Sequence, residues 1–547
     1  MSLQSLYRHK RNKLKCPFTL FLQYLYTNIK IKGELHNMSA IMDQFIGKIR
    51  KLAPDWLMTA AAYIYIFSML VIFPLFFTDG MFNLFLDKRN FFLFFSIAYI
   101  CVMLPAALAA LYDWGNNMYA PKSPDMIFAL ILMSAFVIST VFASDFNETF
   151  FQMSSRTISG LCFLFCMLTY FAIRQHVKLG KLLLWTWIGG SSLLYLFGIF
   201  CACGTNVMNI QIGLEATQLP IYLTPMSNTN FNSVYVCIML PPVMVMYMLC
   251  KDRLSQILCG INIYLGFMFI LFIKTESSII AMILGLILLG YFALETDTWS
   301  ERYIHITGIY LGAKLTIHLL LNLFPARLYP FHGLGLLLLN NMVLICEIVC
   351  FAVFFLLWYW KKNMIREKLA RARKIIVIIG AALACCCIAC VIFANINAAN
   401  ISKDSFLHKL ILTDSTFSGR GFIWLRTAER LKEEPIGRKL FGNGLNSFRT
   451  VMMQFFTLGD GDSTFADPHN EFMQMAMDMG VLGLIGYFGL LLAPLVKGLK
   501  NWRRDSFHII AVLTLSVYMI QALANEYSIY TLPLLFIFLG VVNKKRE

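Results

Sequence analysis

The sequence predicts an all-α, polytopic integral membrane protein: a bundle of about 14 transmembrane helices with a large, mostly helical extracytoplasmic loop. Composition is the first reason, because 59% of the 547 residues are hydrophobic and only 14% are charged. A soluble chain would carry about 25% charged residues. The second reason is that apolar stretches of about 17–27 residues recur from Pro54 to Val542 without alternating with polar residues, which favours helices over barrel strands.

The predicted spans divide the chain into four parts. In order they cover residues 55–77, 91–112, 125–143, 157–173, 182–203, 231–249, 254–273, 277–294, 303–324, 332–358, 375–395, 476–496, 507–525 and 529–542. The parts are a cytoplasmic N-terminal segment (1–54), an eleven-helix membrane domain (55–395), an outer loop (396–475), and C-terminal helices with a basic tail (476–547).

The Lys and Arg residues predict the orientation of these spans. The net charge is +16, and dense basic clusters lie in alternate loops, such as Lys361–Lys374 and Lys497–Arg504. The positive-inside rule places these clusters and both termini in the cytoplasm, and the segments 204–230 and 396–475 outside. It also explains the positive charge without nucleic-acid binding. Lys88, Arg89 and Arg327 are exceptions on the outer side.

The cysteines do not predict a disulfide framework. Most of the 15 lie in spans or on the cytoplasmic side, and the outer loop has none. Only Cys201 and Cys203 approach the outer face. We therefore interpret them as small packing residues.

The first 37 residues are basic and contain no hydrophobic segment typical of a signal peptide. Lys32-Gly33-Glu34 can be encoded by a purine-rich ribosome-binding site, and Met38 follows at a suitable distance. We hypothesise that translation begins at Met38 in a bacterium. A peptide containing Phe18–Tyr24 in the expressed protein would contradict this hypothesis.

A loop as long as 396–475 between membrane helices is uncommon and usually functional. We predict a helix over 419–433 and a second over 446–458. A third is predicted to have Asp467 as its N-cap and Pro468 as its first residue, and to continue into the span near Ala476.

Two ionisable residues fall inside predicted spans, where they are costly and need an explanation. Lys314 and Glu347 each lie about 11 residues from the cytoplasmic end of their span, so at 1.5 Å per residue their depths match. We predict that they pair, and we prefer a structural role for the pair over a proton path.

The outer loop contains a distinctive order of residues. It carries Arg420, Trp424, Gly442, Gly444, Phe448, the pair His469-Asn470, and then Gly480 and Gly483 in the next span. This order resembles the O-antigen ligase/polymerase family of bacterial membrane proteins. Ser227-Asn228-Thr229-Asn230 is similar to that family's Asn-x-Asn segment. Where the family often has a Ser-Arg-Gly-like segment, this chain has Thr275-Glu276-Ser277-Ser278, and Lys274 is a candidate replacement for the missing Arg.

The resemblance implies glycan transfer on the outer face of the cytoplasmic membrane, for capsule, exopolysaccharide or O-antigen synthesis. The donor would be an oligosaccharide on undecaprenyl diphosphate. The acceptor would be a hydroxyl of a glycan, a lipid or a protein, and the transfer would invert the sugar carbon. A flippase and a chain-length regulator would be partners. These residues do not distinguish a polymerase from a ligase, and we slightly prefer a polymerase.

His469 is predicted to be the general base toward the acceptor hydroxyl. A helix N-terminus would keep the imidazole neutral, whereas the neighbouring Asp467 would favour its protonated form. The alternative is a histidine that only caps a turn.

Arg420 is predicted to bind the diphosphate, because a cation at a helix start disfavours the helix but suits an anion site. The alternative is a solvated arginine. Arg156 is the second predicted cation, with an interfacial anchor or a partner for Glu148 as the alternative. Asn470, Trp424, Gly442, Gly444 and Asn230 complete the predicted substrate site, and Trp424 and Phe448 are candidates for stacking on sugars.

Other groups have simpler interpretations. Arg426 and Arg430 are predicted to pair with nearby Glu residues on a solvated helix face. Asp460-Gly461-Asp462 fits an acidic turn better than a metal site. His332, His408 and His469 lack zinc-ligand spacing. With two Arg residues around the diphosphate, we expect neither a metal nor a cofactor.

Two other classes of membrane protein compete with this interpretation. A lipid-linked oligosaccharide flippase has a similar helix count, but such transporters are usually built from repeated halves, and we find no convincing repeat. Glycosyltransferases of the cell-shape and division class share the layout, but they lack the order of Gly-x-Gly and His-Asn seen here.

Overall fold

The structure is a computed structural model that describes residues 34–52, 54–117, 123–154, 156–177, 179–325, 327–329, 331, 333–401, 411, 420–453 and 467–544. Within these residues the chain is helical, and its only strand-like pairing is one isolated bridge between Thr224 and Ser227. The predicted all-α membrane fold is confirmed.

Ten helices in the described residues are long and apolar enough to cross a membrane, and each overlaps a predicted span. They are Asp55–Leu75 (α4, η1 and α5), Leu84–Ala109 (within α6, Leu84–Asn117), α7 (Pro124–Val141), α10 (Lys181–Ala202), α11 (Thr229–Leu249), α12 (Arg253–Ile273), α13 (Glu276–Ala293), α14 (Asp297–Leu323), Asn341–Trp360 (within α16, Asn341–Ile396) and α20 (Glu471–Asn501). The other four predicted spans fall on α9 (Gly160–His176), the second half of α16, α21 (His508–Ala522) and α22 (Leu532–Val542). The total of fourteen stays a prediction.

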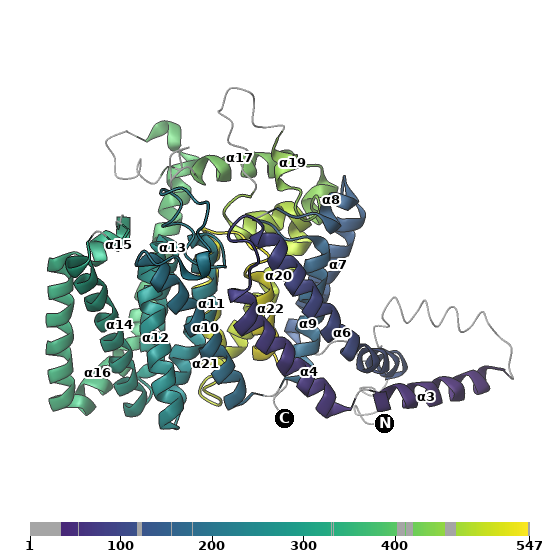
Figure 1. The fold of residues 1–547 in the computed structure, drawn as a ribbon, viewed down its shortest axis with the longest axis horizontal. Helices are drawn as coiled ribbons and strands as arrows, with labels where there is room; N and C mark the ends of the chain where they lie inside the picture. Colours follow the sequence, from purple (N-terminus) through teal and green to yellow (C-terminus); the bar gives the residue numbers. More distant parts are fainter. Residues whose placement is uncertain are drawn as a thin grey trace, which may run out of the picture.

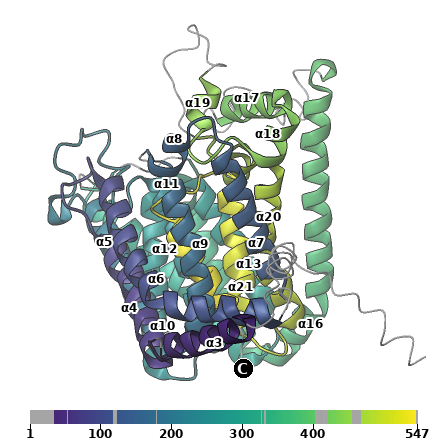
Figure 2. The same ribbon diagram turned by 90° about the vertical axis from the view of Figure 1, so that its right-hand side faces the viewer.

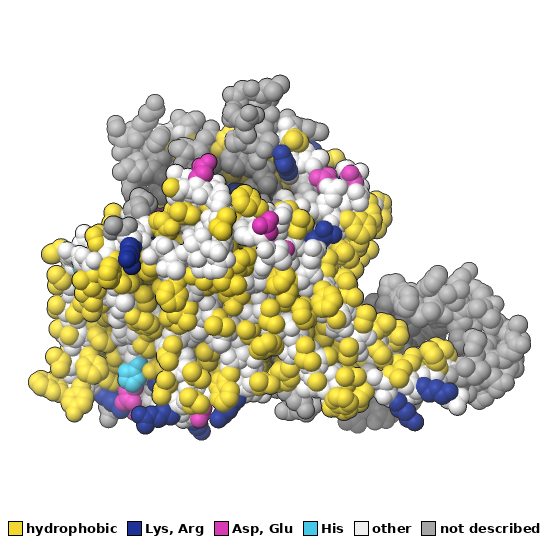
Figure 3. Space-filling view, viewed as in Figure 1, with side chains coloured by type: hydrophobic (Ala, Val, Ile, Leu, Met, Phe, Trp, Pro, Cys, Tyr) yellow, Lys and Arg dark blue, Asp and Glu magenta, His cyan; other side chains and the backbone are white. Residues whose placement is uncertain are grey.

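The spanning helices stand side by side, and α11 lies in the middle of the bundle (Figure 1). Nearly every side chain of α11 from Phe231 to Met248 is buried, which makes this helix the centre of the hydrophobic core. A broad band of hydrophobic side chains runs across the visible face, and Lys and Arg side chains gather along the lower edge of this band (Figure 3). The positive-inside rule predicts that this edge is cytoplasmic.

α16 is too long to be a single span. Its 56 residues would extend about 84 Å at 1.5 Å per residue. Its basic middle segment pairs with residues at the start of α14, through Lys362–Glu301 and Arg366–Asp297. The middle of α16 therefore lies at the end of the bundle where α14 begins. The predicted spans 332–358 and 375–395 flank this segment, although the first is broken, because α15 (Gly333–Leu338) ends before Asn340 caps α16.

Two buried lysines are explained by their partners. The predicted pair of Lys314 and Glu347 is confirmed: the fully buried ammonium of Lys314 donates to Glu347 Oε2 and joins α14 to α16. Lys88, an exception to the charge rule, is also fully buried. Its Nζ donates to the carbonyls of Phe73, Pro74 and Phe76, where the helix ending at Leu75 leaves carbonyls without helical partners.

The described residues of the outer loop form a helical cap at one end of the bundle, with α3 (Glu34–Leu52) at the opposite end (Figures 1 and 2). The cap contains α17 (Arg420–Glu433), α18 (Ile436–Phe441) and α19 (Phe448–Met452). The prediction of a helix over 419–433 is confirmed from Arg420 onward. The second predicted helix is shorter than expected within the described residues, and 454–466 lie outside them.

The predicted start of α20 was wrong. Its N-cap is Asn470, whose side chain accepts the backbone N–H groups of Phe472 and Met473. Asp467 instead accepts the N–H of His469, and His469 has φ 47°, which is not helical. Both Asp and Asn are good N-caps, and the left-handed residue between them decides which one is used. The predicted continuation into the following span is confirmed, since α20 runs to Asn501.

Candidate active site

A tight turn before α20 presents His469. Asp467 Oδ1 accepts the His469 N–H at 2.9 Å, as in an Asx turn. His469 has a left-handed backbone, which costs free energy for a residue with a side chain. Asn470 follows, caps α20, and donates from Nδ2 to the carbonyl of Leu523 at 3.0 Å. The turn is therefore tied both to its own helix and to the segment after α21.

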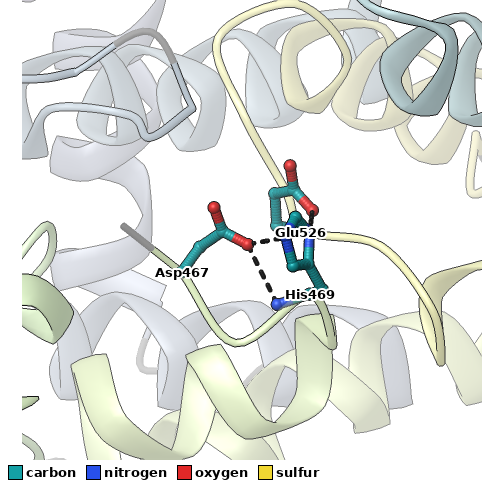
Figure 4. Close-up of side chains that lie close together, drawn as sticks. All are labelled: Asp467, His469 and Glu526. Atoms are coloured by element: carbon teal, nitrogen blue, oxygen red, sulfur yellow. Dashed lines mark hydrogen bonds and ion pairs between the residues drawn. The ribbon is translucent and has the colours of Figure 1, made fainter. Parts of the chain in front are cut away.

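That segment supplies a second carboxylate. Glu526 Oε2 lies 2.9 Å from His469 Nδ1, and Asp467 Oδ1 lies 3.2 Å from the same nitrogen. Figure 4 shows the side chains of Asp467 and Glu526 beside the imidazole of His469, and both carboxylates contact the same ring nitrogen, Nδ1. Because Nδ1 faces two acceptors, it carries the proton in the neutral ring, and Nε2 keeps the lone pair.

A cation lies next to that lone pair. Arg156 Nη1 is 3.4 Å from His469 Nε2 and 3.8 Å from Asp467 Oδ2. Glu148, the alternative partner for Arg156, instead accepts a hydrogen bond from Thr450. The Arg156 side chain is 42% exposed, whereas those of Asp467 and Glu526 are fully buried. The cation is thus the accessible member of the cluster.

The charges of this cluster shift one another's pKa values. Burial lowers the pKa of His469, but the hydrogen bond to Glu526 and the charges of Glu526 and Asp467 outweigh burial and raise it overall. Burial, followed by the charge of Glu526, raises the pKa of Asp467 to about 7. Burial also opposes ionisation of Glu526, yet His469 and Arg156 hold its pKa below the usual value. Glu526 is therefore the carboxylate that stays ionised beside the imidazole.

Arg420 and Trp424 belong to the same neighbourhood. Burial lowers the pKa of Arg420, while the charges of Glu526 and Asp467 act in the opposite direction, so its guanidinium is within electrostatic reach of both. Trp424 lies one helical turn later and donates from Nε1 to the carbonyl of Pro468 at 2.9 Å. The structure thus brings Arg156, Arg420, Trp424, His469 and Asn470 together.

The Gly-x-Gly segment contacts α20 through its backbone. The N–H groups of Asn443 and Gly444 donate to the carbonyls of Met477 and Asp478, both at 2.9 Å. Gly442 has φ 79°, and a Cβ there would lie 2.3 Å from the Asp478 oxygen. Close packing therefore explains Gly442 and Gly444, and their role in substrate binding stays a prediction.

Asn230 is linked to the cluster indirectly. It lies in the first turn of α11, and its carbonyl accepts from Ser233 Oγ at 2.7 Å. The same Oγ accepts from Nδ2 of Asn525, the residue before Glu526, at 3.3 Å. Lys274 donates to the carbonyl of Tyr329 at 2.9 Å, and burial lowers its pKa to about 8.

Sequence reasoning missed Glu526. The signal was present, because Asn525 and Glu526 interrupt the apolar stretch between 507 and 542, and an ionisable residue there points to function by default. The predicted spans end at 525 and begin again at 529, so Glu526 falls in the short loop between them and is not one of the predicted site residues.

Asp467, His469 and Glu526 could each offer one ligand atom to a metal ion, and these atoms lie within 4.8 Å of one another. The donor set of one imidazole and two carboxylates suits a divalent ion. The expectation that the reaction needs no metal therefore stays a prediction. His332, His408 and Asp460–Asp462 lie outside the described residues.

Residues 333–488 match the family model described as O-antigen ligase. Over this part of the chain, less than a third of its length, the protein is similar to an O-antigen ligase domain. The resemblance found in the sequence is thereby confirmed, and the matched residues include Arg420, Trp424, His469 and Asn470. Arg156 and Glu526 lie outside the match, although the structure places both beside His469. A comparison with curated proteins gave no match.

The O-antigen ligase domain indicates that this multi-pass membrane protein joins glycans in polysaccharide synthesis.

Proposed function

We propose that the protein transfers an oligosaccharide from undecaprenyl diphosphate to a hydroxyl group of an acceptor glycan or lipid, at the extracytoplasmic face of a bacterial cytoplasmic membrane. The observation that supports this best is the orientation of His469. Its Nδ1 is held by Glu526 at 2.9 Å, so the lone pair of Nε2 is directed toward the exposed cation Arg156. An oriented base beside a cation is what glycan transfer from a diphosphate requires.

In the proposed reaction, His469 Nε2 removes the proton of the acceptor hydroxyl. The acceptor oxygen forms a bond to the anomeric carbon of the donor sugar, while the bond from that carbon to the diphosphate oxygen breaks. The electron pair leaves with the lipid diphosphate, and the proton stays on His469 until it is released. Attack opposite the leaving group inverts the anomeric carbon. Glu526 and Asp467 stabilise the imidazolium that forms.

The leaving diphosphate needs compensating positive charge. Arg156 is partly exposed and is held only by a 3.8 Å contact to Asp467 and a 3.4 Å contact to the imidazole. A diphosphate would compete well for this guanidinium, because Arg binds phosphate oxygens through two parallel hydrogen bonds. Arg420 would contribute from the start of α17. Polymerase and ligase use the same donor chemistry, and we retain the slight preference for polymerase.

The test is transfer of a labelled lipid-diphosphate oligosaccharide by purified protein in liposomes. His469→Ala should abolish transfer, and Arg420→Ala should raise the KM for the donor. The matched control is His305→Ala, at an exposed position on α14, which should transfer normally. Normal transfer by His469→Ala would overturn the proposed base, whereas a wild-type protein that moves the labelled donor across the bilayer without transferring it would support the flippase alternative.

Metal dependence is tested in the same assay. EDTA should have no effect. A loss of activity that zinc or magnesium restores would contradict the metal-free mechanism and would assign the ion to Asp467, His469 and Glu526.

A further inference from the structure

We propose that Asp478 and Tyr527 are positioning residues that hold Glu526 against His469. The inference rests on the proposed role of His469 as the base, and it adds two residues that lie outside the predicted site. It begins with the segment that carries Glu526.

The segment 523–531 between α21 and α22 is a non-helical connection whose side chains from Asn525 to Thr531 are all at most 2% exposed. Irregular backbone inside a membrane protein is tolerated only where protein or a water-filled cavity surrounds it. The connection therefore depends on specific partners. The carbonyl of Leu523 is the first anchor, because it accepts from Asn470 Nδ2 at 3.0 Å.

Asn525 provides an anchor on one side of Glu526. Its Nδ2 lies 3.3 Å from Ser233 Oγ on α11 and 3.2 Å from Ser277 Oγ on α13. This amide therefore fixes the connection to the central helix and to one neighbour. Among the described residues, His469 is the one side chain that bonds to Glu526, through Oε2, and Glu526 Oε1 has no hydrogen-bond partner. The direction of the carboxylate is thus set mainly by its neighbours in the chain.

Tyr527 provides the anchor on the other side. Its hydroxyl donates to Asp478 Oδ2 on α20, and both side chains are almost fully buried. Asp478 Oδ1 has no hydrogen-bond partner among the described residues. Within this part of the chain, the Tyr527 hydroxyl is therefore the only hydrogen-bond partner of the Asp478 carboxyl group. Burying a carboxyl with one partner is expensive, and an apolar pair of similar size would cost less. The polar pair is therefore explained better by the geometry it imposes than by the stability it contributes.

Asp478 lies where three parts of the site meet. Its carbonyl accepts the N–H of Gly444 at 2.9 Å, which attaches the outer loop. Two residues later α20 kinks at Gly480, whose φ is 66°. Through its side chain Asp478 holds Tyr527. The turn with His469 precedes the same helix, so Asp478 couples the segment that presents the base to the segment that presents its carboxylate.

The deciding experiment uses Tyr527→Phe, which removes the hydroxyl and keeps the ring. The pKa of His469 is measured in the full-length protein without donor, from hydrogen–deuterium exchange at imidazole C2, read by mass spectrometry on the peptide that contains His469. Releasing Glu526 should lower this pKa, in the same direction as Glu526→Gln, by up to about one unit. The kcat of transfer should fall about tenfold to a hundredfold with KM unchanged, because small misplacements of a catalytic group are costly.

The matched control is Tyr235→Phe. Tyr235 is equally buried, and its hydroxyl has no hydrogen-bond partner among the described residues, so the same substitution should change neither the pKa nor kcat. Asp478→Asn keeps an oxygen acceptor for Tyr527 and should retain activity, whereas Asp478→Ala should behave like Tyr527→Phe. If Asp478→Ala does not fold, Tyr527→Phe still decides the question.

Two outcomes would overturn the inference. One is an unchanged His469 pKa in Tyr527→Phe. The other concerns the Tyr527→Phe/Glu526→Gln double variant. If its fold-decrease in kcat equals the product of the two single fold-decreases, the residues act independently, whereas residues that act through one another do not have additive effects on free energy. The pKa measurement needs no transfer activity. A wild-type protein without transfer activity, or normal transfer by His469→Ala, would remove the proposed function or the proposed base, and a shifted pKa in Tyr527→Phe would still leave the positioning of Glu526 intact.

Discussion

Replacing Glu526 with glutamine should move the pH dependence of transfer to lower pH and lower its maximum. The substitution keeps the shape of the side chain and one acceptor oxygen 2.9 Å from His469 Nδ1, but it removes the negative charge. That charge and hydrogen bond are what raise the His469 pKa against the effect of burial. The base must be neutral to accept a proton, so the rate rises as pH rises through this pKa. Lowering the pKa therefore moves the acidic limb to lower pH.

The size of the effect follows from the contact. Hydrogen bonds to charged groups contribute about 1.5–3 kcal/mol, and 1.36 kcal/mol corresponds to one pKa unit. The His469 side chain is only 13% exposed, so solvent screens little of this interaction. The limb should move down by about one to two units. The maximal rate should fall about a hundredfold, because general-base catalysis contributes about 10²–10⁴-fold and the imidazolium loses its counter-charge.

The assay is the pH profile of kcat between pH 5 and 9 with purified protein in liposomes. The control is Glu148→Gln, at a carboxylate that accepts a hydrogen bond from Thr450 and does not contact His469. This substitution should leave the pH profile unchanged. A limb that stays in place or moves to higher pH in Glu526→Gln would refute the argument that Glu526 sets the basicity of His469.

Three further predictions concern a buried ion pair, the attachment of the cap and the positioning of His469. Lys314→Met should destabilise the protein by about 3–5 kcal/mol, because it leaves Glu347 without its buried partner. A Lys314→Met/Glu347→Leu variant should recover most of the lost melting temperature, measured in detergent, and no recovery would contradict the pairing. Gly442→Ala should loosen the cap and increase its cleavage by protease, since its Cβ would meet the Asp478 oxygen at 2.3 Å, whereas Gly437→Ala, with nothing within 4 Å, should not. Trp424→Phe loses the 2.9 Å hydrogen bond to the Pro468 carbonyl and should lower kcat about tenfold at unchanged melting temperature; a rate equal to wild type would show that this bond does not position His469.

Hydropathy and charge predicted most of the fold, because both reflect the solvent and not the detailed packing. Ten predicted spans coincide with long apolar helices, and the pairing of Lys314 with Glu347 followed from depth alone. The predictions differ from the structure at the start of α20 and within the span 332–358. At both places the boundary depends on which residue caps the helix, and several nearby residues are suitable caps. Periodicity does not reveal that His469 takes a left-handed conformation.

The sequence predicted candidate residues that lie in one loop and missed the candidate that a distant segment contributes. Arg420, Trp424, His469 and Asn470 lie within about 50 residues of one another, and the structure brings them together as expected. Glu526 reaches His469 across 57 positions and through the non-helical connection after α21. No pattern in a single sequence shows such a contact, although an acidic residue in an apolar stretch is itself a signal of a functional position.

The two helices that support Glu526 are short. α21 has 15 residues and α22 has 11, which correspond to about 22 and 16 Å, against a hydrocarbon layer of about 30 Å. The connection between them is therefore recessed within the bundle. In the proposed reaction, a prenyl-linked sugar donor would meet the base without withdrawing its tail from the lipid. Bulk water, which would waste the activated sugar by hydrolysis, would have to enter the same recess to compete with the acceptor.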